Sequence, residues 1–178
     1  LIVHPGITGD RGPSSLDWAI LNGETEWGVT LLQASEVMDG GDIWASETFP
    51  MRDGGKSSLY RREVTDAAVA ALKRVLEQLQ DPAFKPQPLD YNREGVRGQW
   101  RGLMTQQDRA IDWQRDSSQR VVTKINSADG NPGLLDCVLG IDCYLYNASV
   151  DRSHRGDPGQ VIGQRQGAIC IATVDGAV

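Results

Sequence analysis

A histidine and an aspartate near the start of the chain are the residue types that proton transfer needs. His4 stands in the run His4-Pro5-Gly6, and Asp39 stands in a glycine-rich run that ends at Asp42. A carboxylate beside an imidazole favours the charged ring, which can donate a hydrogen bond to a carbonyl oxygen as it becomes an oxyanion. The same pair can pass a proton to a leaving nitrogen. A histidine beside a glycine turn is more often structural, so spacing alone leaves both interpretations open.

Short strands and a helix are expected to position this pair. The expected elements are a strand end at 1–3, a helix capped by Ser14 or Ser15 that stops at Asn22-Gly23, and strands at 28–34 and 43–49. Ligands commonly bind beyond the carboxyl ends of strands in open parallel sheets. We therefore expect His4 and Asp39 on loops at the same edge of one sheet.

Four short motifs follow one another in this stretch: His4-Pro5-Gly6, Arg11-Gly12, Gly28-Val29-Thr30 and Met38-Asp39-Gly40-Gly41. Their order resembles the second half of the catalytic domain of 10-formyltetrahydrofolate-dependent formyltransferases, whose pattern is Asn-x-His-Pro-Ser, Arg-Gly, Gly-Val-Thr and Leu-Asp-x-Gly. The ordered set is specific, although no single piece is. Within the family, the segment GDRGPSSLDWAI is most similar to members that act in the maturation of nickel-iron hydrogenases.

The resemblance implies an enzyme, a one-carbon transferase with small-molecule substrates and no metal. It makes His4 the catalytic histidine and Asp39 the catalytic aspartate. It also implies that the backbone of Glu36, Val37 and Met38 meets the folate ring of the donor, 10-formyltetrahydrofolate. Similarity to the hydrogenase branch implies coenzyme A as the formyl acceptor and the hydrogenase maturation machinery as a partner.

One departure from the family pattern bears directly on the chemistry. The family's catalytic asparagine falls on Ile2, whose side chain cannot donate a hydrogen bond. Removing one oxyanion donor typically costs about 2.7 to 4 kcal/mol of transition-state stabilisation. Either another donor compensates or the chemistry differs. The formyltetrahydrofolate hydrolase and dehydrogenase branch also resembles this chain in having isoleucine there, so hydrolysis of the formyl donor is the alternative enzymatic function.

The pattern of helix, proline and strand signals predicts an α/β chain with two parts. Residues 1–85 are expected to be the C-terminal half of the catalytic domain of the resembling family, which is the C-terminal part of a Rossmann-like sheet. Because the first half of the family domain is expected to precede Leu1, we expect residues 1–85 to leave one edge of the sheet exposed. A helix from Ser57 or Ser58 to about Gln80 should cover this sheet through a stripe of aliphatic side chains. Residues 86–102 are expected to be a linker, whose arginines at 93, 97 and 101 either bind a phosphorylated ligand or are solvated.

Residues 103–178 show a different pattern, a short helix followed by closely spaced strands. Ser117 or Ser118 caps the helix, and residues 129–133 form a dense turn. A hairpin broken near Gly140 is expected over 134–150, followed by strands over 160–162 and 168–174 that a turn at 163–167 separates. Short strands at this spacing suggest a small barrel. By resemblance this part is the OB-like C-terminal domain of the formyltransferases, and is truncated.

Charge and cysteine content limit the partners and the compartment. The net charge is −6, with 8 basic and 13 acidic residues in 1–85 and 10 basic and 11 acidic residues in 86–178. This balance argues against nucleic acid, and therefore against a third alternative, a tRNA-binding module with a vestigial site. The three cysteines are unpatterned and indicate a reducing compartment, the cytoplasm. No apolar run approaches the roughly 20 residues that span a bilayer.

Overall fold

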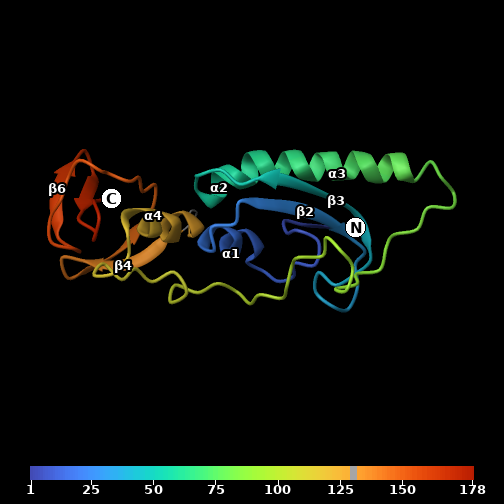
Figure 1. Ribbon diagram of the computed structural model, residues 1–178, viewed down its shortest axis with the longest axis horizontal. Helices are drawn as coiled ribbons and strands as arrows, with labels where there is room; N and C mark the ends of the chain where they lie inside the picture. The colour runs from blue at the N-terminus through green and yellow to red at the C-terminus, as the bar shows by residue number, and fades with distance from the viewer. Residues whose placement is uncertain (129–131) are drawn as a thin grey trace. The chain divides into compact units, whose positions relative to one another are not determined.

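The computed structural model describes residues 1–128 and 132–178, and it divides into two compact units, Leu1–Met104 and Thr105–Val178. Figure 1 shows the elements of each unit. No helix within the described residues is long and apolar enough to cross a membrane.

The first unit is built on an antiparallel sheet in the order β1 (Ile2–His4), β2 (Glu26–Leu32) and β3 (Ile43–Pro50). The parallel arrangement expected from the sequence is therefore wrong for these strands. The helix between β1 and β2, α1 (Ser15–Leu21), has only 7 residues and is about 10 Å long. Strand β2 runs opposite to β1 and pairs Thr30 with His4, so residues 5–25 do not form the crossover of a parallel pair.

Strand β1 pairs only with β2 among the described residues, and its side chains at Leu1 and Val3 are exposed. Strand β1 is therefore an edge strand among the described residues, and the expectation that this sheet is the second half of a larger one stays a prediction. On the interior side, α1 contributes Leu16 and β2 contributes Trp27 and Val29, and all three are almost completely buried.

A long helical segment covers the sheet, as the sequence predicts. It consists of α2 (Lys56–Leu59), a π-helical turn (Tyr60–Val64) and α3 (Thr65–Gln78). The sequence predicts that one stripe holds Leu59, Val64, Ala68, Ala71, Leu72, Val75, Leu76 and Leu79. Leu59, Val64, Ala71 and Val75 are buried as predicted. The prediction is wrong for Leu72, Leu76 and Leu79, which are exposed, and Ala67 is buried beside the stripe. A π turn adds one residue, which rotates the following face of the helix. The small side chains of Ala67 and Ala71 then face the sheet.

The second unit combines α4 (Ser118–Ser127) with two hairpins, β4 (Leu134–Val138) with β5 (Ile141–Leu145) and β6 (Val161–Arg165) with β7 (Ala168–Ile171). The Ser117 hydroxyl caps α4 by accepting a hydrogen bond from the Arg120 amide, so this prediction is confirmed. Both hairpins turn through two residues with positive φ, which suits the right-handed twist of the flanking strands. The turn predicted at 129–133 begins outside the described residues.

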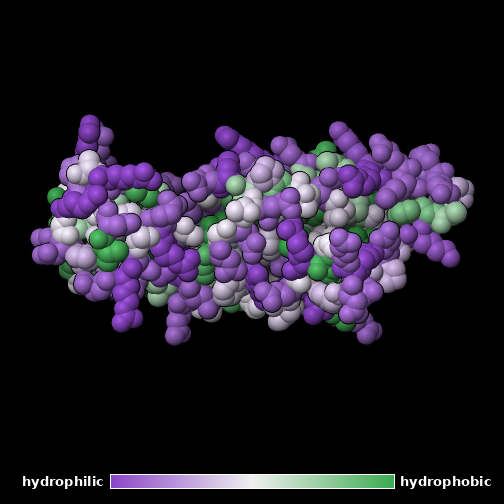
Figure 2. Space-filling model, viewed as in Figure 1, coloured by the Kyte–Doolittle hydropathy of each residue, from purple (hydrophilic) through white to green (hydrophobic). Residues whose placement is uncertain are grey.

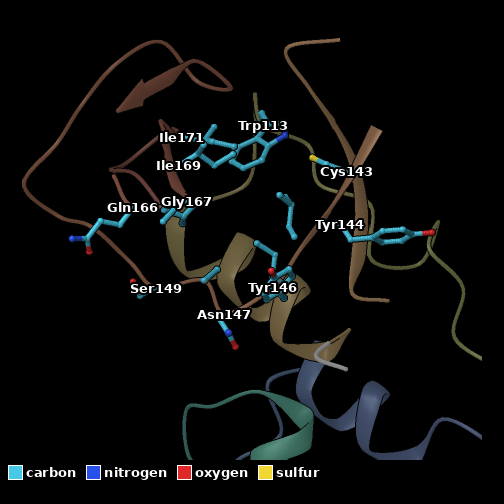
Figure 3. A pocket seen from close by; sticks show the side chains of 15 residues that line it. Trp113, Cys143, Tyr144, Tyr146, Asn147, Ser149, Gln166, Gly167, Ile169 and Ile171 are labelled. Carbon is cyan, nitrogen blue, oxygen red and sulfur yellow. The ribbon is translucent and has the colours of Figure 1, made fainter. Parts of the chain in front are cut away.

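The hairpins of the second unit do not close a barrel within the described residues, because β4–β5 and β6–β7 share no ladder hydrogen bonds. A cavity of about 520 Å³ lies between them. Figure 3 shows Trp113, Ile169 and Ile171 grouped on one side of this cavity. The predicted barrel therefore corresponds here to two separate hairpins packed around α4.

Candidate active site

His4 ends β1 and is almost completely buried, with 3% of its surface exposed. Its two ring nitrogens face two different carboxylates. Nδ1 lies 3.5 Å from Oδ2 of Asp39, and Nε2 lies 3.0 Å from Oδ2 of Asp10. The structure thus brings together the histidine and the aspartate that the sequence singles out, and adds a second acid.

Asp39 lies in the loop that joins β2 to β3, residues 33–42. The Gly12 amide donates a hydrogen bond of 3.0 Å to its Oδ2, so the backbone of the preceding loop fixes this carboxylate. Asp39 also has a φ of +51°, in the left-handed region. Non-glycine residues are uncommon there and such positions cluster at functional sites. The side chain of Asp39 remains 13% exposed, more than that of His4.

Asp10 is the member of the cluster that sequence reasoning did not single out. Its side chain is 1% exposed, and its Oδ1 has no hydrogen-bond partner within the described residues. The only signal in the sequence is an acidic residue in a glycine-rich loop just after the histidine. No helix or strand period links the two residues, because a tight turn, in which the Asp10 amide donates to the Ile7 carbonyl at 2.8 Å, brings them together.

Glu36, Val37 and Met38, the segment expected at the folate ring, are exposed on the same loop as Asp39. Val37 and Met38 are 54% and 55% exposed. The Val37 carbonyl accepts a hydrogen bond of 3.1 Å from the Gly40 amide, which shapes the tight turn before β3. Two apolar side chains therefore project from this loop near the candidate catalytic pair.

Residues 87–101, which we call the strap, lie along the loop that carries Asp10. The Gly98 amide donates to the Thr8 carbonyl at 3.0 Å, and the Arg101 amide donates to the Arg11 carbonyl at 2.9 Å. A side chain at Gly98 would place its Cβ 1.8 Å from the Asp10 nitrogen, so only glycine allows this close approach. Most of the expected linker, 86–102, is thus the packing partner of the site loop.

The strap arginines interact with side chains of the same unit. Arg97 pairs with Glu26, Arg93 donates to the Gln87 amide oxygen, and Arg101 lies 4.0 Å from Glu24. These contacts engage guanidinium groups that would otherwise be available to bind a phosphorylated ligand. Another guanidinium, that of Arg11, lies 6.0 Å from the ring centre of Tyr91 and 5.8 Å from that of Trp100, a cation–π arrangement.

The cavity of the second unit falls within the size range of small-molecule sites, roughly 300 to 1,000 Å³. It is lined by neutral side chains, including Trp113, Tyr144, Tyr146 and Asn147. Because proton transfer needs a titratable pair, the cluster at His4 is the better candidate for chemistry.

Comparison with known proteins supports this choice. Residues 103–178 match the formyl transferase C-terminal domain. The chain is 49% identical to the hydrogenase maturation factor HoxX of Bradyrhizobium diazoefficiens over 178 residues, which is 100% of this chain and 31% of that protein. It is also 29% identical to the methionyl-tRNA formyltransferase of Roseiflexus castenholzii, over 98% of this chain and 55% of that enzyme.

A solved structure agrees over the same length. The crystal structure of HypX from Aquifex aeolicus in complex with tetrahydrofolic acid superimposes with a TM-score of 0.90 and 45% identity, covering 99% of this chain and 30% of HypX. The chain therefore spans about a third of HoxX and HypX. Sequence and fold together show that residues 103–178 carry the formyl transferase C-terminal domain and that the whole chain is similar to HoxX and HypX.

Proposed function

We propose that this chain is part of an enzyme that transfers a formyl group from 10-formyltetrahydrofolate. The observation that carries the proposal is the meeting of His4 and Asp39, within 3.5 Å, from two motifs that lie far apart in the sequence. Similarity to HypX, whose structure contains tetrahydrofolic acid, supports a folate-type donor.

The chemistry follows from the properties of the pair. The acceptor attacks the formyl carbon, and the His4 ring donates a hydrogen bond to the oxyanion that develops on the carbonyl oxygen. Asp39 holds the ring charged and takes the proton of the acceptor. The bond between the formyl carbon and the folate nitrogen N10 then breaks, and the proton passes to N10, which leaves tetrahydrofolate and a formylated acceptor.

Access to His4 comes from the side of Asp39, in this proposal. Asp39 is the more exposed of the two, and the loop of residues 33–42 that carries it is largely exposed. The folate ring contacts the backbone of Glu36, Val37 and Met38, and displacement of this loop opens the path to the ring nitrogen. Catalytic contacts are often loose in the free enzyme and tighten when substrate binds.

The acceptor in this proposal is the thiol of coenzyme A, and the product is a formyl thioester used in nickel-iron hydrogenase maturation. Similarity to HoxX supports this role. The free cysteines at 137, 143 and 170 fit a reducing compartment, the cytoplasm.

The test uses the full-length protein and follows consumption of 10-formyltetrahydrofolate with and without coenzyme A. We expect His4→Ala and Asp39→Asn each to lower the rate by roughly a hundredfold or more, as for other catalytic acid–base groups. His154→Ala is the matched control, because the side chain of this second histidine is 66% exposed and lies in the other unit. Unchanged rates in both site variants would remove the proposed roles.

Hydrolysis of the formyl donor is the second candidate, and Ile2 is the observation that favours it. Ile2 stands on β1, two residues before His4, and offers no side-chain donor where the family pattern has asparagine. Formate released at the full rate without any acceptor would support hydrolysis. Strict dependence on coenzyme A would exclude it.

A further inference from the structure

His4 lies between two carboxylates, and Asp10 is at the shorter distance. The contact from His4 Nε2 to Asp10 Oδ2 is 3.0 Å, against 3.5 Å from Nδ1 to Asp39. The two nitrogens lie on different sides of the ring, so contacts to both fix its rotation as well as its position. Asp10 thus holds the ring by the nitrogen that Asp39 does not contact.

The burial of Asp10 is unfavourable for stability on its own. Its side chain is 1% exposed, and Oδ1 has no hydrogen-bond partner among the described residues. Burying a carboxylate with an unpaired oxygen costs free energy, and such groups in native proteins call for a functional or structural explanation. The contact with His4 is the one polar interaction that the described residues give to the Asp10 side chain.

Gly6 provides the space in which His4 and Asp10 meet. A Cβ at this position would lie 2.4 Å from His4 Nε2 and 2.5 Å from Asp10 Oδ2. Both distances are below any real contact of a Cβ atom, so every other residue would push the pair apart. The pattern of the resembling family has serine here, which makes Gly6 a second departure beside Ile2.

The backbone of Asp10 is held from two directions. Its amide donates to the Ile7 carbonyl at 2.8 Å, and Gly98 of the strap lies against its nitrogen. The carboxylate is therefore presented to His4 by a constrained loop. This is the condition for a side chain that orients another one.

We propose that Asp10 is a positioning residue of the site, which holds the His4 ring through Nε2, and that Gly6 is the residue that makes this contact possible. Nδ1, on the side of Asp39, is then the nitrogen that donates to the formyl oxygen once the loop of residues 33–42 is displaced. The proposal rests on the proposed function of His4. Asp10 acts through the imidazole and does not touch the substrate, because its side chain is buried behind the ring.

The first experiment replaces Asp10 by Asn in the full-length protein, which keeps the shape and removes the charge. We expect kcat to fall roughly a hundredfold, between the effect of an outer-shell partner and that of a triad aspartate. The KM for 10-formyltetrahydrofolate should stay within twofold, because Asp10 does not contact it. Asp151→Asn is the matched control, since Asp151 binds the exposed His154 at 2.7 Å in the other unit.

Nitrogen-15 NMR of labelled histidine measures the chemical shifts of the ring nitrogens. If Asp10 served only the stability of the fold, its replacement would not change these shifts. The ring signals of His4, assigned from their absence in His4→Gln, should shift in Asp10→Asn, whereas those of His154 should not. Asp151→Asn should give the reverse result. Unchanged His4 signals in folded Asp10→Asn would overturn the proposal whatever the activity.

The second experiment tests Gly6. We expect Gly6→Ala to lower kcat at least tenfold and to shift the same His4 signals, because the new Cβ enters the contact between His4 and Asp10. Gly102→Ala is the control, since a Cβ there meets nothing within 4 Å. Full activity with unshifted signals in Gly6→Ala would overturn the proposal, and this variant decides the matter if Asp10→Asn does not fold.

The double variant Gly6→Ala with Asp10→Ala measures whether the two residues act together. If Gly6 serves the contact between His4 and Asp10, the two losses should combine to less than their product, because coupled positions are not additive. The loss that Gly6→Ala still causes beside Asp10→Ala reflects the approach of the new Cβ to His4 itself, at 2.4 Å from Nε2. Rates that multiply would show two independent effects and overturn the role of Gly6. Full activity of Asp10→Asn together with loss of activity in His4→Ala would reject this inference alone, whereas full activity of His4→Ala would reject the proposed function.

Discussion

Asp175 shows how one carboxylate fixes a local structure in the second unit. Its Oδ1 accepts hydrogen bonds from the amide of Ser118, at 2.7 Å, and from the Ser118 hydroxyl, at 2.9 Å. These bonds at the first turn of α4 lower the pKa of Asp175 below its ordinary value of 3.8, the amide bond of Ser118 being the main cause. A lowered pKa in the folded state means that the ionised carboxylate stabilises the fold.

Asp175→Asn is expected to lower the stability most at neutral pH. The contribution of the carboxylate is complete above its unfolded pKa of about 3.8 and is lost as the pH falls through the lower folded value. Urea unfolding at pH 7 and at pH 3.5 should therefore show a difference between wild type and variant that shrinks in acid. Asp142→Asn, on exposed β5, is the charge-matched control, and a difference that grows in acid would contradict the interpretation.

At the candidate active site, the sequence predicts the meeting of two of the three clustered side chains. His4 and Asp39 could be predicted because each belongs to a short ordered motif. Asp10 could not, because its contact with His4 depends on a tight turn and on the absence of a side chain at Gly6. A contact of this kind produces no helix-like or strand-like spacing of residues in the sequence. Pair contacts within irregular loops are therefore found from coordinates.

At the scale of elements, local sequence signals predict where a helix or strand occurs better than they predict its direction or which of its faces is buried. The cap of α4 and the glycine turns of the hairpins placed those elements correctly, because each signal acts within a few residues. The direction of β1 relative to β2 depends on the path of residues 5–25 between them, and the buried face of α3 depends on a π turn. Neither is encoded in a local cap or turn residue.

Leu59 and Leu76 were predicted to lie on one apolar stripe, and they provide a matched test of the observed facing. Leu59 is 0% exposed and Leu76 is 55% exposed. Leu59→Ala should lower the free energy of unfolding by about 2 to 5 kcal/mol, as buried leucines do. Leu76→Ala should change it by less than about 0.5 kcal/mol. Chemical denaturation of both variants measures this, and equal losses would mean that another surface covers Leu76.

The strap gives a second prediction at this scale. Gly98→Ala should displace the strap from the Asp10 loop, because the added Cβ would clash with backbone atoms that cannot rotate away. We expect a lower melting temperature and weaker formyl transfer together, since the same loop carries Asp10. Gly102→Ala should leave both unchanged. Normal activity with a lower melting temperature would show that the strap stabilises the fold without affecting the site.

For the chain as a whole, the net charge argues against nucleic acid as a partner. The chain carries a net charge of −6, and Figure 2 shows a predominantly hydrophilic face on which apolar side chains are scattered. Phosphate contacts need clustered cations, and the strap arginines at 93, 97 and 101 interact with neighbouring side chains. The tRNA-binding alternative therefore has little physical support.

The full-length protein is expected not to bind tRNA in a salt-dependent manner. Filter binding between 50 and 200 mM salt, where a protein with 6 to 10 phosphate contacts loses roughly a thousandfold or more in affinity, measures this directly. A methionyl-tRNA formyltransferase serves as the positive control. Tight tRNA binding that weakens with salt would support the tRNA-binding alternative and would argue against coenzyme A as the acceptor.

The strap also sets a condition on how the protein is made. The carbonyl of Arg11 receives its hydrogen bond from the amide of Arg101, so this early loop cannot complete its contacts until the ribosome has synthesised the later segment. At 5 to 20 residues per second, that delay is roughly 5 to 18 s. Throughout it, the nascent loop around His4 lacks the partner that holds Asp10 in place. Newly made chains should thus acquire substrate competence late, after helix α3 has already emerged.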